Sequence, residues 1–229
     1  MHANAVQSDA EARELLADAI REMDEYYQQR GIFQDRFGFG EKPAVVVVDF
    51  AYGWTDDAYA GGSRRLDAPV ENTAELLEAA RRQGIPIIYT TSPFRPEADD
   101  AMFKSAADFS SEFRRWDRRA CEIDERIAPR PRELVIEKES ASAFAGTHLA
   151  GYLTQHRVDT LLIAGCSTSA CIRATATDAK SCRFQPIILG DCVGDRSAVA
   201  HVFTLADIQA RFADVVTLEE TLEYLGTLA

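Results

Sequence analysis

The cysteine at position 171 is the residue whose setting points most directly to chemistry. It ends the segment Gly165-Cys166-Ser167-Thr168-Ser169-Ala170-Cys171, which follows an apolar run at 160–164 and precedes a helix-like run at 172–181. A tight turn of small residues that delivers a thiol to the start of a helix places unpaired N–H groups and partial positive charge beside the sulfur. We therefore expect the thiolate to be favoured, and the same N–H groups to stabilise the oxyanion formed when sulfur attacks a carbonyl.

Two charged residues at the ends of other apolar runs complete a nucleophilic set. Asp49 follows the valines at 45–48, and Lys138 follows the run at 134–137. A partly desolvated carboxylate can accept the thiol proton, and a lysine beside it can stabilise both the carboxylate and a thiolate. Each residue alone also fits a structural role, the aspartate as a loop cap and the lysine in a salt bridge. The chemistry therefore requires a fold that brings Asp49, Lys138 and Cys171 together.

The pattern of apolar runs predicts such a fold. Strands are expected at 44–49, 86–91, 134–137, 160–164, 186–190 and 215–218, with helices at 72–83, 148–156, 172–181, 197–211 and 218–225. A further helix is expected at 111–121, inside a long charged segment. Strands that alternate with helices predict an α/β fold, here a three-layer, doubly wound, six-stranded parallel sheet with helices on both faces. Ligands bind such sheets beyond the carboxyl ends of the strands, where all three residues would lie.

The N-terminal segment precedes this alternating pattern. We expect a helix with an apolar stripe, capped by Ser8 and running to Gln29, followed by polar, glycine-bearing chain as far as residue 42. The chain is therefore divided into an N-terminal helical arm, residues 1–37, and an α/β domain, residues 38–229. The apolar stripe suits packing either on the chain's own domain or on a neighbouring subunit.

Composition excludes several classes of partner and site. The formal net charge of −12 argues against nucleic acid and against anionic membrane surfaces. No apolar stretch approaches the roughly 18 residues of a membrane span, and no signal pattern opens the chain, so a cytoplasmic location is expected. The five cysteines form no CxxC pair, which argues against a zinc site or a disulfide framework. Cys121, Cys182 and Cys192 are expected to be small buried residues of the core.

Three of these segments together resemble the isochorismatase-like cysteine hydrolases. They are Val46-Val47-Val48-Asp49-Phe50, then Lys138 with Ser142-Ala143-Phe144-Ala145-Gly146-Thr147, and then residues 165–171 with the helix that follows. The resemblance extends over roughly residues 38–226 and implies a cysteine hydrolase domain with a triad of Asp49, Lys138 and Cys171. It also implies a homotetramer.

The resemblance further implies a cis peptide bond between Cys166 and Ser167. That bond would turn the N–H groups of Ser167 and Cys171 toward the oxyanion. Members of the superfamily that act on isochorismate lack the nucleophilic cysteine, so Cys171 implies a hydrolase of amide or carbamoyl bonds. The nicotinamidase branch carries a metal site with an Asp-x-His pattern and a histidine after the second strand, whereas residues 90–96 here hold no histidine. No metal and no cofactor are therefore expected.

Within the superfamily the chain most resembles the N-carbamoylsarcosine amidohydrolases, with the maleamate amidohydrolases next. Both act on substrates that bear a carboxylate, and in the former an arginine beyond the nucleophile binds it; Arg196 stands at the matching position. An arginine at a strand end beside a helix start is a good bidentate receiver of a carboxylate, with pairing to Asp195 or another acid as the alternative. Thr168, Phe50 and Trp116 are further candidates for contact with the substrate.

The expected partner is thus a small amide or ureido acid. Maleamate, ureidoacrylate and other short amides or ureas stay open as substrates. Outside the enzymes, the alternative is a catalytically silent binding protein of the same fold. A redox pair of Cys166 and Cys171 is disfavoured, because their spacing is not that of a CxxC motif.

Overall fold

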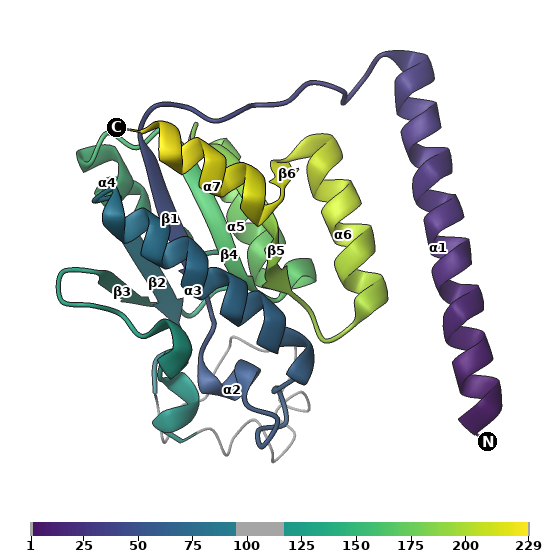
Figure 1. Ribbon diagram of the computed structural model, residues 1–229, viewed down its shortest axis with the longest axis horizontal. Helices are drawn as coiled ribbons and strands as arrows, with labels where there is room; N and C mark the ends of the chain where they lie inside the picture. Colours follow the sequence, from purple (N-terminus) through teal and green to yellow (C-terminus); the bar gives the residue numbers. More distant parts are fainter. Residues whose placement is uncertain (1, 95–116, 229) are drawn as a thin grey trace.

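Six parallel strands form the centre of the molecule (Figure 1). They are β1 (Pro43–Val48), β2 (Ile87–Thr91), β3 (Leu134–Glu137), β4 (Thr160–Cys166), β5 (Gln185–Gly194) and β6 (Asp214–Val216). Their order across the sheet is β3-β2-β1-β4-β5-β6, so the chain builds one half from β1 to β3 and the other from β4 to β6. After β1 the chain adds strands toward one edge of the sheet, and from β4 it adds them toward the other edge. The strand order therefore reverses between β1 and β4, and doubly wound sheets bind ligands at this switch point.

Helices cover both faces of the sheet, which confirms the predicted three-layer fold (Figure 1). One face carries α3 (Asp67–Arg82) and α7 (Leu218–Thr227), and the other carries α4 (Leu149–Gln155), α5 (Arg173–Ser181) and α6 (Ala198–Arg211). β1 is buried along its whole length, with Val45 and Val47 in the first apolar layer and Val46 and Val48 in the second. The valine run is continuous because both faces of this central strand are covered.

Shorter elements lie around the carboxyl ends of the strands. α2 (Tyr52–Thr55) follows β1, and a π-helical turn, η5 (Thr168–Ile172), follows β4 and leads into α5. Three 3-10 turns occur as well: η1 (Arg64–Leu66), η3 (Arg119–Cys121) and η4 (Glu125–Ile127). By contrast, α1 (His2–Arg30) stands beside α6, away from the sheet (Figure 1).

The computed structural model describes residues 2–94 and 117–228, of which residues 2–13 are described by their backbone. Within these ranges the predicted strands and helices are found, with bounds that differ by a few residues; the largest differences are at the starts of α1, which begins at His2, and of α3, which begins at Asp67. The predicted cap Ser8 is wrong, because α1 already begins at His2; the alanines and glutamates around Ser8 are good helix formers. Most of the helix predicted at 111–121 lies outside the described residues, and its end forms the 3-10 turn η3.

The predictions for the three remaining cysteines are confirmed only in part. Cys192 is fully buried and Cys121 is half-buried, but Cys182 is exposed. Cys182 directly follows the last residue of α5, where the helix ends and the chain meets solvent. No helix in the described ranges is long and apolar enough to cross a membrane.

Candidate active site

Asp49, Lys138 and Cys171 meet beyond the carboxyl ends of β1, β3 and β4. The Nζ atom of Lys138 lies 2.7 Å from Oδ2 of Asp49 and 3.8 Å from Sγ of Cys171. The side chains of Lys138 and Asp49 are only 3% and 4% exposed, so this ion pair is shielded from water. The structure thus brings together the three residues that the sequence singled out.

The backbone at Asp49 turns its carboxylate toward this point. Its φ angle of 57° lies in the left-handed region, which residues other than glycine rarely occupy. Two hydrogen bonds with Thr90 of β2 hold Asp49 in this conformation. The Asp49 N–H group donates to the Thr90 carbonyl at 3.1 Å, and the Thr90 hydroxyl donates to Asp49 Oδ1 at 2.9 Å. Backbone strain of this kind persists where the surroundings enforce it, and it concentrates at functional sites.

β4 reaches the site through a close approach to β1 at Gly165. This glycine has a φ angle of 126°, and a Cβ atom there would lie 2.0 Å from the carbonyl oxygen of Val48. No other residue fits, because both the space and the backbone angle require glycine. Next along the chain is the Cys166–Ser167 peptide bond, which is cis as predicted. The Cys166 thiol donates to the carbonyl oxygen of Asp49 at 3.3 Å and so joins the two turns.

Lys138 is held as an ammonium group by its neighbours. Burial acts to lower the pKa of Lys138, but the negative charge of Asp49, the interaction with Cys171 and the hydrogen bond to Asp49 together outweigh it, and the pKa is raised above its ordinary value. The ammonium also donates to the Ser140 carbonyl at 2.9 Å. The site therefore contains a permanent positive charge between the carboxylate and the sulfur.

The thiol of Cys171 is not the activated thiolate that the sequence led us to expect. Burial, followed by the negative charge of Asp49, raises the pKa of Cys171 to about 12, although Lys138 and the N–H group of Ser167 act in the opposite direction. Cys171 also lies inside the π-helical turn η5 rather than ahead of a helix. The expectation of a favoured thiolate is therefore wrong for the resting protein. The sulfur keeps its proton and lies within hydrogen-bonding reach of the Asp49 carboxylate.

The turn that carries Cys171 is fastened to the chain that follows β5. Asp195 accepts hydrogen bonds from the N–H group and the hydroxyl of Ser169, at 2.9 and 2.7 Å. The hydroxyl of Thr168, itself fully buried, lies 2.8 Å from Nδ1 of His201 on α6. Burial lowers the pKa of His201, with the charge of Asp195 acting against that change. A neutral imidazole and a carboxylate thus anchor two successive residues of the turn.

Arg196 lies against the same turn. Its Nη2 atom donates to the Ser167 hydroxyl at 3.0 Å, and its Nη1 atom donates to the Gly61 carbonyl at 3.2 Å. Asp195, the alternative partner, instead accepts hydrogen bonds from Ser169 and from the N–H group of Ser197. Within the part of the chain that the structure describes, Arg196 forms no ion pair with a carboxylate. A positive charge therefore remains available beside the turn.

The other predicted contacts with substrate are placed differently. Phe50 is fully buried in the apolar layer between the sheet and α3. Trp116 lies outside the described residues. Sequence reasoning passed over Thr90 and His201, which fix Asp49 and the nucleophile turn. The position of Thr90 near the end of a neighbouring strand was a usable signal, whereas nothing near His201 in the sequence points to this contact.

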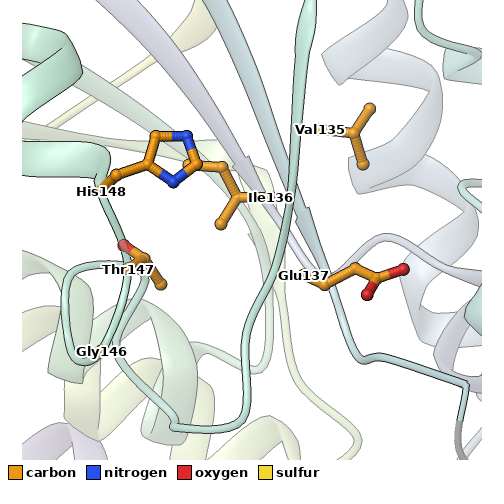
Figure 2. A pocket seen from close by; sticks show the side chains of 6 residues that line it. All are labelled: Val135, Ile136, Glu137, Gly146, Thr147 and His148. Carbon is orange, nitrogen blue, oxygen red and sulfur yellow. The ribbon is translucent and has the colours of Figure 1, made fainter.

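A separate hollow of about 760 Å³ lies at the outer edge of the sheet (Figure 2). Its lining comes from β3 and from the end of the segment that leads into α4: Val135, Ile136, Glu137, Gly146, Thr147 and His148. Ile136 points toward His148, whereas Val135 and Glu137 point to the other side of the strand (Figure 2). No group of three or more histidine, cysteine, aspartate or glutamate side chains in the described ranges is arranged to hold a metal ion.

The chain matches the Isochorismatase domain family over residues 43–220, which span all six strands. The chain belongs to the isochorismatase family. This confirms the resemblance seen in the three sequence segments. The family match begins at β1 and ends within α7, so it contains Asp49, Lys138, Cys171 and Arg196.

Two relatives in this family cover nearly the whole chain. An N-carbamoylsarcosine amidase from an Arthrobacter species is 35% identical over 227 residues, which is 96% of this chain and 86% of the relative. A maleamate amidohydrolase from Pseudomonas putida is 37% identical over 219 residues, which is 93% of this chain and 100% of the relative.

Solved structures agree with the fold. A cysteine hydrolase from Pseudomonas syringae pv. phaseolicola superimposes with a TM-score of 0.76 at 23% identity, over 85% of this chain and 97% of that chain. An N-carbamoylsarcosine amidase from Thermoplasma acidophilum gives a TM-score of 0.64 at 26% identity, over 78% of this chain and 97% of that chain. The six-stranded α/β architecture is therefore that of the isochorismatase-like hydrolases.

Proposed function

We propose that this chain hydrolyses the terminal amide or carbamoyl C–N bond of a small substrate that bears a carboxylate, with Cys171 as the nucleophile. The observation that carries the proposal is the buried contact of Lys138 with both Asp49, at 2.7 Å, and Cys171, at 3.8 Å. A thiol, a carboxylate and an ammonium group in contact can form and break bonds to a carbonyl carbon. The amidase and amidohydrolase names of the two relatives support this reaction class.

The first step joins the sulfur to the carbonyl carbon. Because burial raises the pKa of Cys171 to about 12, its proton must pass to Asp49 as the sulfur–carbon bond forms. The carbonyl oxygen becomes an oxyanion, stabilised by the N–H groups of Ser167 and Cys171. Cys166 contributes the cis peptide bond that orients these groups. The Lys138 ammonium offsets the negative charge on whichever of the sulfur and the carboxylate carries it.

The next steps release ammonia and restore the thiol. Asp49 gives its proton to the departing nitrogen as the carbon–nitrogen bond breaks, which leaves a thioester, or a thiocarbamate when the substrate is a ureido acid. Asp49 then takes a proton from water as the water attacks the same carbon, and the sulfur–carbon bond breaks with return of a proton to Cys171. One water is consumed for each ammonia released, and a carbamate product loses carbon dioxide.

Arg196 is the proposed receiver of the substrate carboxylate. It uses two of its five N–H donors on Ser167 and Gly61, so the remaining donors can bind a carboxylate. We place N-carbamoylsarcosine first among substrates, which would yield sarcosine, carbon dioxide and ammonia. Maleamate is second. The support for both is the position of Arg196 beside the turn, together with relatives of nearly equal identity that carry these two substrate names.

Ammonia release from the purified protein tests the proposal. N-carbamoylsarcosine, maleamate, ureidoacrylate and nicotinamide would be compared in parallel, each beside the Cys171→Ala variant. We expect release from N-carbamoylsarcosine or maleamate and none from the variant. Release that persists in Cys171→Ala would overturn the proposed nucleophile, and silence of the wild-type protein on all four compounds would overturn the proposed activity.

We also propose that the chain assembles as a homotetramer. Exposed apolar side chains support association: Val199, Val202 and Phe203 on α6, and Leu15 and Tyr26 on the neighbouring helix α1. Exposed apolar side chains that gather on two adjoining helices are typical of contact surfaces between subunits. Light scattering after gel filtration should give a mass four times that of the 25.4 kDa chain, and a monomer would contradict the proposal.

A further inference from the structure

Trp54 and Gly61 form a support beneath Arg196 that the reaction itself does not explain. Trp54 belongs to α2. This short helix follows β1 and lies beyond the carboxyl end of that strand (Figure 1). The central carbon of the Arg196 guanidinium group is 4.7 Å from the centre of the Trp54 ring. A guanidinium group at this distance from an indole is attracted by the negative face of the ring. Trp54 also packs against the apolar layer on the α3 side of the sheet, so its ring has a fixed backing.

Gly61 has no side chain, and this leaves room for the Trp54 ring. A Cβ atom on residue 61 would lie 2.7 Å from two carbon atoms of the Trp54 ring and 2.9 Å from the carbonyl oxygen of Gly53. A side chain there would therefore push the ring or the 56–62 loop away. The carbonyl oxygen of the same residue accepts the hydrogen bond from Arg196 Nη1 at 3.2 Å. Gly61 thus provides both room for the ring and an acceptor for the guanidinium group.

Without this support, little in the described residues would fix Arg196. The side chain belongs to an exposed residue, and arginine loses substantial rotamer freedom when it is held in one position. Asp195, the adjacent acid, is already bound to Ser169 and Ser197. Within residues 2–94 and 117–228, the contacts that hold the guanidinium group are the Trp54 ring, the Gly61 carbonyl and the Ser167 hydroxyl.

We propose that Trp54, seated on Gly61, is a positioning residue that makes the enzyme selective for substrates with a carboxylate, because it holds the Arg196 guanidinium group beside Ser167. This inference rests on the proposed function and names the residues that set its substrate class. Ser167 directly follows the cis peptide bond, and its N–H group faces the sulfur of Cys171. A carboxylate on the held guanidinium group would therefore lie at a fixed distance from the attacking atom.

Substitution of Trp54 by leucine tests the inference. Leucine keeps an apolar side chain on α2 but removes the ring, and phenylalanine keeps a smaller ring. We expect Trp54→Leu to raise KM for N-carbamoylsarcosine or maleamate about tenfold with kcat changed less than about twofold, and Trp54→Phe to fall between. Phe212→Leu is the matched control, because Phe212 also lies beneath an arginine, Arg173, at 5.6 Å, but at the far end of α6. It should leave KM unchanged.

Binding to an inactive protein separates this inference from the proposed reaction. In the Cys171→Ala background, calorimetry with maleamate and with its neutral diamide, maleamide, reports affinity without turnover. Trp54→Leu should weaken maleamate about tenfold and leave maleamide unchanged, and it should add nothing further once Arg196→Gln is present.

Three results would overturn the inference. The first is equal affinity for maleamate with and without Trp54→Leu in the Cys171→Ala background. The others are an equal loss of affinity for maleamide, and a further loss of affinity for maleamate when Trp54→Leu is added to Arg196→Gln. A Cys171→Ala protein that binds no carboxylate compound would overturn it too. Absence of ammonia release from the wild-type protein, by contrast, would count against the proposed function and leave these binding results to decide on Trp54.

Discussion

Replacement of Asp49 by asparagine should stop hydrolysis and at the same time make Cys171 more reactive toward an alkylating agent. Asparagine keeps the size of the side chain and can still accept the hydrogen bond from Thr90. It carries no negative charge, however, and cannot carry the proton from the thiol to the leaving nitrogen. The Lys138 ammonium, 3.8 Å from the sulfur, would then act on the thiol without its carboxylate partner.

The size of the effect follows from the charges around the sulfur. Two unit charges about 4 Å apart interact by about 4 kcal/mol at an effective permittivity of about 20, which corresponds to about 3 pKa units. Burial is the larger cause of the raised pKa of Cys171, about 12, and the substitution leaves burial in place. We therefore expect the pKa of Cys171 to fall by about 2 units and the thiolate fraction at pH 8 to rise about 100-fold.

Alkylation by iodoacetamide, followed by mass spectrometry of the peptide that contains Cys171, measures this change. The rate constant at pH 8 should rise about 100-fold in Asp49→Asn, while ammonia release falls at least about 1000-fold. The exposed thiol of Cys182 is the internal control, since its rate should be the same in both proteins. Slower alkylation of Cys171 in the variant would refute the reasoning, because it would mean that Asp49 activates the thiol in the resting protein.

Three further predictions concern specificity, the nucleophile turn and alkaline stability. Arg196→Gln should raise KM for maleamate about 100-fold and leave maleamide unaffected, since only a carboxylate gains from the charge; equal losses in steady-state kinetics would contradict this. Thr168→Val should lower the free energy of unfolding by about 1–2 kcal/mol in urea titrations, because His201 Nδ1 loses its partner at 2.8 Å; an unchanged midpoint would show that this bond does not stabilise the turn. Burial raises the pKa of Cys192 from 9.0 to about 12, so the unfolded chain releases the thiol proton at a lower pH than the folded protein does. The free energy of unfolding therefore falls as the pH rises from 9.0 to about 12, by up to about 1.4 kcal/mol per pH unit. Cys192→Ala should flatten this fall in unfolding experiments, whereas alanine at the exposed Cys182 should not.

The strands and the three central residues could be predicted because their signals are local. β1 is fully buried on both faces, so its sequence is a continuous valine run, and the residue that ends the run is the carboxylate itself. Lys138 and Cys171 follow apolar runs in the same way. A parallel sheet brings the carboxyl ends of all its strands to one edge, so the convergence followed from topology alone.

The protonation state of Cys171 and the support of Arg196 could not be predicted, because they depend on contacts between distant segments. A helix start and a nearby lysine both favour a thiolate, yet burial and the charge of Asp49 act more strongly on the sulfur. The Trp54 ring meets Arg196 only after α2 and the start of α6 have been placed. Phe50 looked like a pocket residue because it follows Asp49, but the left-handed turn at Asp49 directs the chain so that Phe50 packs into the core.

The central claim is that Cys171 forms a covalent intermediate with the substrate after ammonia has left. Rapid acid quenching during turnover of N-carbamoylsarcosine or maleamate, followed by mass spectrometry of the digested protein, tests it most directly. The account predicts an adduct with the mass of the substrate less ammonia on the peptide that contains Cys171, absent from the Cys171→Ala variant. Turnover with no adduct, together with activity that survives in Cys171→Ala, would contradict it.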